Sequence, residues 1–190
     1  IGDGNGFKLG KTVGMPESVV QRTLTNCIAC NHRQNGFSQQ SAQAKMIYHN
    51  NTSYNNHGYG YEFVDYNMAD ILKNNISFRD GTAAPKKSNQ KSDHNSWQGG
   101  LKLTKKDFVS LDEAQLLRSR KTNGNLPDIT FLHLANGSDL IDGGENIGLR
   151  FNGKAPDIGA FETQPGESGS TPLDIFMWLK ILYILFTTLL

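Results

Sequence analysis

Asparagine recurs at a nearly constant interval in the first half of the chain. Asn26, Asn51 and Asn75 are 25 and 24 residues apart, and each lies in a short run of strand-forming residues. In each run an apolar or small residue follows two positions after the asparagine. Cys30 follows four positions after Asn26, and Tyr54 and Phe78 follow three positions after Asn51 and Asn75. A repeat of this length with strand-like units predicts a solenoid, in which parallel strands of successive coils stack on one another.

Pairs of glycine and an aromatic residue repeat at the same interval. Gly36-Phe37 and Gly60-Tyr61 are 24 residues apart, and Gly6-Phe7 is a third pair of this kind. The residues that follow the three pairs are Lys8, Ser38 and Glu62. Because side chains alternate along a strand, we expect the aromatic ring to point inward and Lys8 to point outward from the solenoid.

The repeat and the composition divide the chain into three parts. We expect residues 1–162 to form the C-terminal portion of a solenoid whose N-terminal part is missing. Residues 163–172 are rich in Gly, Ser and Pro, which is typical of a linker. Residues 173–190 are strongly apolar and contain Asp174 and Lys180. This tail has three interpretations, which the sequence leaves open: a membrane anchor, an interfacial helix, or a segment foreign to the native domain.

Irregular elements are expected beyond the repeat. Residues 82–96 predict a polar loop, and residues 97–110 and 129–134 predict strands. Residues 111–120 predict a short helix, because acidic residues near its start favour the positive end of the helix dipole.

The bulk composition excludes some functions. The net charge is only +1, and the basic cluster of Lys86, Lys87 and Lys91 lies in the polar loop, so we expect no nucleic-acid binding. Cys27 and Cys30 have no second ligand pair for zinc. Positions three apart in a strand face opposite sides, so we expect no disulfide between them and one of the two packed inward.

The first residues approach a phosphate-binding loop without matching it. Gly10-Lys11-Thr12 fits the end of that motif, but Asn5 stands where its first glycine belongs. Pro16 follows closely and would interrupt the long helix that such a loop requires. We therefore expect no nucleotide binding.

Several segments together resemble a known family. They are residues 3–10 (Asp-Gly-Asn-Gly-Phe-Lys-Leu-Gly), 24–37, 48–52, 72–76 and the closing run 155–162. Across residues 2–162 they are similar to polysaccharide lyase family 9, the pectate lyases that fold as right-handed parallel β-helices. The resemblance implies that Lys8 is the catalytic base. It also implies a calcium ion held by aspartates one or two coils earlier, upstream of Ile1, and therefore no metal ligands in this chain. We assign Asn5 and Lys11 as candidate substrate-binding residues.

The implied reaction is the β-elimination of pectate. A base removes the proton next to the uronate carboxylate, and the glycosidic oxygen leaves. Bound calcium can neutralise the carboxylate, and a lysine acts as a base only in its neutral form. The implied partner is an acidic polysaccharide (pectate, or polygalacturonate), and the protein would be secreted, with surface anchoring if the tail is an anchor. We expect the isolated chain to be nearly inactive. The alternative is a non-catalytic β-helix that binds carbohydrate or acts as a surface adhesin.

Overall fold

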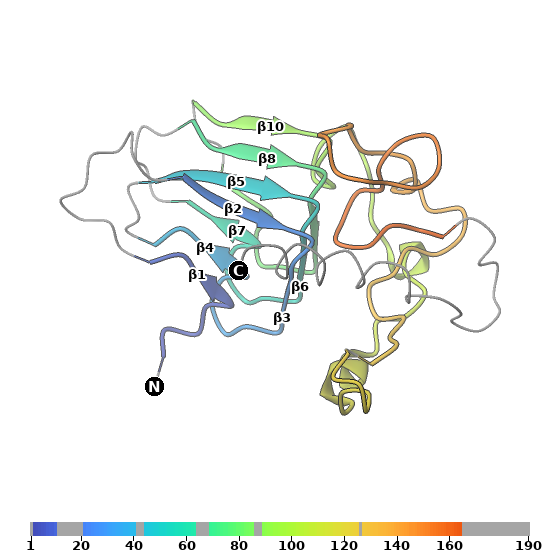
Figure 1. Ribbon diagram of the computed structural model, residues 1–190. Coiled ribbons are helices and arrows are strands. Elements are labelled where there is room, and N and C mark those ends of the chain that lie inside the picture. Colours follow the sequence, from blue (N-terminus) through green and yellow to red (C-terminus); the bar gives the residue numbers. More distant parts are fainter. Residues whose placement is uncertain are drawn as a thin grey trace, which may run out of the picture.

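Short parallel strands stack into the coils of a β-helix (Figure 1). The computed structural model describes residues 2–10, 21–40, 44–63, 69–85, 89–125 and 127–164. Within these residues, every pair of named strands is parallel. The right-handed parallel β-helix expected from the sequence is confirmed.

Three sheets run along the solenoid, and one coil supplies one strand to each. Sheet 1 contains β1 (Phe7–Lys8), β4 (Phe37–Ser38) and β7 (Tyr61–Glu62). Sheet 2 contains β2 (Gln21–Thr25), β5 (Lys45–His49), β8 (Ile71–Lys73) and β10 (Lys91–Asp93). Sheet 3 contains β3 (Ile28–Cys30), β6 (Thr52–Tyr54) and β9 (Ile76–Phe78).

The strand register corrects the alignment of the asparagine repeat by one residue. Thr25 pairs with His49, and His49 pairs with Lys73, so Asn26 aligns with Asn50 and Asn74. These three asparagines have φ angles of 54°, 51° and 59°. Asparagine tolerates this left-handed conformation better than most residues, which explains its recurrence at the turn. The predicted pairing of Asn26 with Asn51 and Asn75 is therefore wrong, and the period is a uniform 24 residues here.

A ladder of buried asparagines joins the coils at the same turn. Its rungs are Asn51, Asn75 and Asn95, whose side chains are fully buried. Oδ1 of Asn75 accepts hydrogen bonds from N and Nδ2 of Asn51, at 3.0 and 3.1 Å. Nδ2 of Asn75 donates to the carbonyl oxygen of Tyr48 and to Oδ1 of Asn95, both at 2.8 Å. Because a buried amide is costly only when it lacks partners, this ladder fixes the register at little penalty.

Aromatic rings stack inside the solenoid next to sheet 1. The ring of Phe37 lies between those of Phe7 and Tyr61, with 4.9 Å between the centroids on each side. Trp97 continues the column at 5.3 Å from Tyr61. This spacing follows that of neighbouring strands, about 4.8 Å, so each coil adds one ring to the column. The inward orientation predicted for the aromatic residue of the Gly-aromatic pairs is confirmed.

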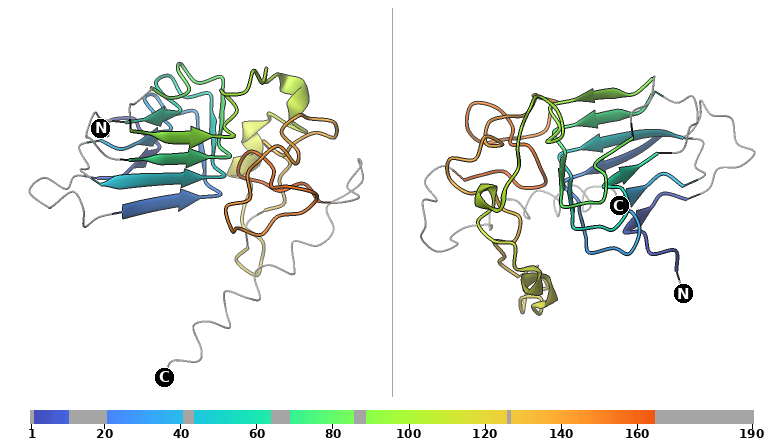
Figure 2. Two further views of the ribbon diagram at one scale, coloured as in Figure 1. Left: turned by 90° about the horizontal axis from the view of Figure 1, so that it is seen from above. Right: turned by 180° about the vertical axis from the view of Figure 1, so that it is seen from behind.

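The chain beyond the coils packs against the outward face of sheet 3 (Figures 1 and 2). Tyr54 and Ile76 of that sheet share a second apolar cluster with residues from three later segments. The buried residues of those segments are Phe108, Phe131, Leu132, Leu134, Leu140 and Ile158. Cys27 contacts the inner core and Cys30 this outer cluster, and both are free thiols. The predicted opposite orientation of the two cysteines is confirmed.

Several irregular elements differ from the expectations. The expected loop 82–96 contains β10, and Lys91 lies on that strand. Residues 97–110 and 129–134 form isolated bridges in place of strands, because each pairs with the other at single positions only. Residues 105–107 form a 3₁₀ helix, η1 (Lys105–Asp107). The helix expected over 111–120 is a shorter 3₁₀ helix, η2 (Glu113–Leu117), with Asp112 as its N-cap.

The last described residues are held by carboxylates that accept backbone hydrogen bonds. Asp157, which is buried, accepts from N of Asp142 at 2.8 Å and from N of Thr163 at 2.6 Å. Glu162 accepts from N of Asp157 at 3.1 Å. Residues 165–190, including most of the expected linker and the apolar tail, lie outside the described residues. Among the residues that are described, no helix is long and apolar enough to cross a membrane.

We expect Asn75→Ala to destabilise the coils by about 3 kcal/mol, because it removes two donors and leaves the buried N–H of Asn51 without its acceptor. Urea unfolding of the chain measures this change. Asn123→Ala, at an exposed turn, is the control and should cost less than about 1 kcal/mol. Equal losses in the two variants would contradict a stabilising ladder.

The stability of the C-terminal segment should depend on pH through Glu162. Burial and the neighbouring charge of Asp157 raise the pKa of the Glu162 carboxyl from 4.5 to about 7. The folded state therefore keeps a proton that the unfolded chain releases, and the stability from this proton is lost as pH rises from about 4.5 to about 7. Thermal melts at a pH below and a pH above this range measure the decline, and Glu162→Gln should flatten it. Glu113→Gln, at an exposed carboxylate, should leave the decline as it is.

Candidate active site

Lys8 lies on the outward face of sheet 1. Its neighbour Phe7 packs against the inner core, and the side chain of Lys8 is 49% exposed. Lys8 pairs with Ser38 on β4, and Ser38 pairs with Glu62 on β7, as the Gly-aromatic pairs predicted. The predicted position and orientation of Lys8 are confirmed, whereas its role as a base stays a prediction.

The ammonium group of Lys8 forms an ion pair with Asp3. The side chain of Asp3 is 55% exposed and belongs to the loop that leads into β1. Sequence reasoning missed this partner, because no regular element places residues five apart next to each other. The contact lies in a loop in which Gly4 has a φ of 84°, a value accessible mainly to glycine.

Of the two predicted substrate-binding residues, the structure describes one. Oδ1 of Asn5 accepts a hydrogen bond from N of Asn35 in the next coil, at 3.1 Å. Oδ1 of Asn35 in turn accepts from N of Tyr59 at 2.8 Å. The carbonyl oxygen of the Asn5 side chain is therefore engaged in joining coils. Lys11 lies outside the described residues.

Polar groups continue along the outward column beyond Lys8. Ser38 is fully buried, and its hydroxyl donates to Oε2 of Glu62 at 2.6 Å. His32 lies against the backbone of Gly6, just before β1, and its partial burial lowers the pKa of its imidazole. A lowered pKa leaves this histidine neutral at neutral pH. Lys8 and Glu62 thus supply the charged ends of the column, with Ser38 between them.

The described residues do not fit a calcium site. Near Lys8 the carboxylate of Asp3 is already paired with the ammonium. Elsewhere in the described part of the chain, the one group of three possible metal ligands is Asp93, His94 and Glu145. Calcium takes six to eight oxygen ligands, whereas His94 offers nitrogen. Lys73 also competes for this group, since its Nζ lies 2.6 and 2.5 Å from the two oxygens of Glu145.

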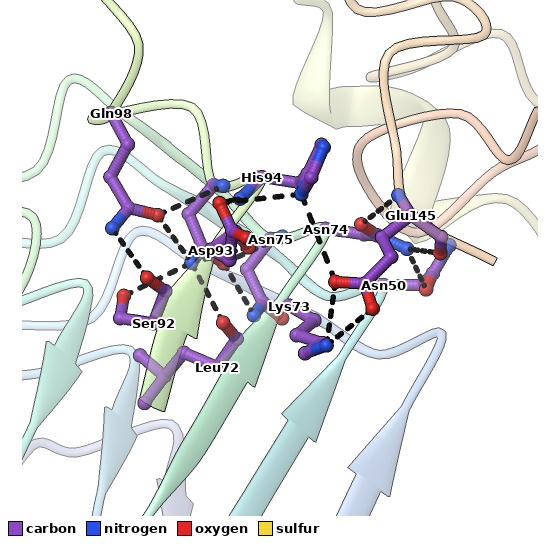
Figure 3. A network of polar contacts seen from close by, with 11 residues as sticks. Asn50, Leu72, Lys73, Asn74, Asn75, Ser92, Asp93, His94, Gln98 and Glu145 are labelled. Carbon is purple, nitrogen blue, oxygen red and sulfur yellow. Dashed lines mark hydrogen bonds and ion pairs between the residues drawn. The ribbon is translucent and has the colours of Figure 1, made fainter. Parts of the chain in front are cut away.

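This second cluster is a polar network that attaches the C-terminal segment to sheet 2 (Figure 3). Asn74 donates from Nδ2 to the carbonyl oxygen of Glu145 and accepts from N of Glu145, both at 2.8 Å. His94 Nδ1 lies 3.3 Å from Asp93 and 3.8 Å from Glu145. Since every group has a protein partner, the network is explained by its role in joining the two parts of the fold.

Comparisons with known proteins agree with the fold. Pectate lyase L of Dickeya dadantii is 35% identical over 165 residues, which are 85% of this chain and 37% of the relative. Pectate lyase PEL9 of Emericella nidulans is 31% identical over 140 residues, 73% of this chain and 34% of the relative. The chain thus spans little more than a third of these relatives.

Solved structures give the same result. The crystal structure of pectate lyase Pel9A matches with a TM-score of 0.73 and 33% identity, over 86% of this chain and 40% of that one. A rhamnogalacturonan lyase matches with a TM-score of 0.61 and 30% identity, over 73% of this chain and 38% of that one. The proteins that the chain resembles are named as pectate and rhamnogalacturonan lyases, and the fold that it shares with them is a parallel β-helix. The chain belongs to the rhamnogalacturonan lyase-like family, and the family model of the C-terminal part matches residues 86–185. The resemblance to family 9 is confirmed.

Close packing before β1 generates a prediction about Gly6. A Cβ atom there would lie 2.4 Å from the ring of His32 and 2.7 Å from the carbonyl oxygen of Gly36. We expect Gly6→Ala to destabilise the chain by about 2 kcal/mol, because the backbone that carries Lys8 would have to move. Thermal or urea unfolding measures this. Gly2→Ala, where no atom lies within 4 Å of the new Cβ, should be neutral, and equal effects would contradict the packing argument.

Proposed function

We propose that this chain forms the catalytic-base-bearing coils of a pectate lyase-like enzyme that cleaves polygalacturonate by β-elimination. The observation that carries the proposal is the placement of Lys8. It is an exposed amine on the outward face of a β-helix sheet, in a chain whose relatives are named pectate lyases. Rhamnogalacturonan lyase is also similar, so an acidic pectic polysaccharide is the substrate class that both similarities support.

In the proposed step, Lys8 acts in its neutral form. Its amine takes the proton next to the uronate carboxylate, and the electron pair of that C–H bond forms the new carbon–carbon double bond. The bond to the glycosidic oxygen breaks, and the oxygen leaves with that bond's electrons. A general base of this kind contributes about 10²- to 10⁴-fold to a rate. The proton ends on Lys8, which is then an ammonium and can pair with a carboxylate.

Calcium and secretion remain part of the proposal. Calcium would supply a positive charge to neutralise the uronate carboxylate, and its ligands would come from residues other than those described. A polymeric substrate is met outside the cell, so we also propose that the protein is secreted. Attachment to a surface through residues 173–190 stays an open interpretation, because these residues lie outside the described ones.

One observation favours the non-catalytic alternative, a β-helix that binds carbohydrate or acts as a surface adhesin. The ion pair with Asp3 satisfies the ammonium form of Lys8, whereas the reaction needs the neutral amine. A protonated Lys8 would suit the binding of a uronate carboxylate without turnover. The two functions therefore differ in whether unsaturated product forms.

Substitution of Lys8 tests the choice between them. In the longest form of the protein that its gene encodes, we expect Lys8→Ala to lower the formation of unsaturated uronides about 10²- to 10⁴-fold. The ultraviolet absorbance of the product, with polygalacturonate and calcium, measures this rate. Lys106→Ala, at an exposed lysine of η1, is the control and should keep full activity.

Two results would contradict the assignment. Full activity of Lys8→Ala would exclude Lys8 as the base. Absence of product from the wild-type protein, together with tight binding of polygalacturonate, would support the binding module instead.

A further inference from the structure

Asp3 is the charged partner that the described part of the structure gives Lys8, and it lies in the loop that leads into β1. Asp3 stands between Gly2 and Gly4, and Gly4 adopts a φ of 84°. The chain then enters β1, which ends at Lys8. This path brings the Asp3 carboxylate back to the lysine ammonium, five residues later in the sequence.

Arg33 of the next coil packs on this loop. Its Nη2 donates to the carbonyl oxygen of Gly2 at 3.3 Å. A Cβ atom on Gly4 would lie 3.1 Å from Cβ and 3.3 Å from Nε of Arg33, so the arginine side chain lies directly over the glycine. N of Gln34 donates to the carbonyl oxygen of Gly4 at 2.9 Å. The loop is therefore attached to the second coil on both sides of Asp3.

The other charged groups around Lys8 differ from Asp3 in their position. Glu62 is two coils away along the outward column and accepts from Ser38. His32 packs on Gly6, and burial lowers the pKa of its imidazole, which leaves it neutral. Arg33 donates a hydrogen bond to the backbone of Gly2. Lys11 lies outside the described residues.

We infer that Asp3 is the positioning residue for Lys8: it orients the amine and stabilises the ammonium that forms when Lys8 takes the substrate proton. The inference rests on the proposed function, because it concerns the step in which Lys8 acts as a base. A base that is oriented by a third group is the general arrangement of activated catalytic side chains. Asp3 accepts hydrogen bonds from the ammonium and takes no proton, so the atoms and electrons of the elimination are unchanged.

An ordinary surface ion pair would be the simpler explanation, and such pairs contribute little. It does not account for the loop, however, in which Gly4 has a left-handed φ, and Arg33 and the backbone of Gln34 bind the residues on either side of one exposed aspartate. Because side chains that must hold a reacting group need such support, the loop favours a role for Asp3 in positioning.

The test is the pair of kinetic constants kcat and KM for Asp3→Asn, in the longest form of the protein that its gene encodes. We expect about a fivefold lower kcat, with KM nearly unchanged, because the ammonium loses a stabilising charge. Asp3→Glu keeps the charge and should restore most of kcat.

Asp128→Asn is the matched control. It removes another lysine–aspartate ion pair, that of Lys121 and Asp128 at 2.6 Å, far from β1 in the sequence and outside the coils. This variant should keep the wild-type kcat and KM. An Asp3→Asn enzyme that behaves in the same way would overturn the inference, and so would a lower kcat that Asp3→Glu does not restore, because that result indicates a structural role alone.

The two proposals fail in different ways. If Lys8→Ala is inactive while Asp3→Asn resembles Asp128→Asn, the role of Asp3 is excluded and Lys8 remains the base. If Lys8→Ala is fully active, the proposed base is wrong and the role of Asp3 falls with it.

Discussion

Hydrogen bonding between buried amide side chains and the backbone of the next coil is the constraint on which the fold depends. Asn51, Asn75 and Asn95 lie one above another with no exposure to water, so each must find its partners in the coils on either side. A slip of one residue would leave buried donors unpaired and would turn every inward side chain outward. The column of Phe7, Phe37 and Tyr61 rings is possible only in the same register.

The candidate site uses this rigidity. Lys8 is aimed outward because Phe7 is held inward by stacking, and the loop before β1 is attached to the second coil through Asn5 and Arg33. The C-terminal segment has a different role: it covers sheet 3 and pairs with Lys73 at the end of β8 in sheet 2, away from the outward face of sheet 1. The candidate site and the packing of the C-terminal segment thus use different faces of one solenoid.

The repeat made the coils predictable from sequence, because stacked coils impose the same residue type at the same place. Prediction failed by one residue at Asn26. Cys27 follows this asparagine at the ladder position, whereas in the next two coils a turn asparagine is followed directly by a ladder asparagine. Beyond residue 97 no repeat exists, so contacts between Phe108 and Leu134 had no local signal. The pairing of Lys8 with Asp3 was hidden for a similar reason. It depends on the φ angle of Gly4 and on Arg33, almost thirty residues later.

The shared register also means that a chain with this fold can gain or lose one whole coil without disturbing the coils on either side. Residues 50–73 begin at one left-handed asparagine and end just before the next, so their loss or duplication would join two equivalent backbone positions. The rings and ladder amides on either side of the junction would meet as they do now. An insertion or deletion of any other length inside a strand would break both columns at once. A chain with this fold can therefore change in length by whole coils or within the loops, while Asp3, Lys8 and Ser38 keep their places in the first two coils.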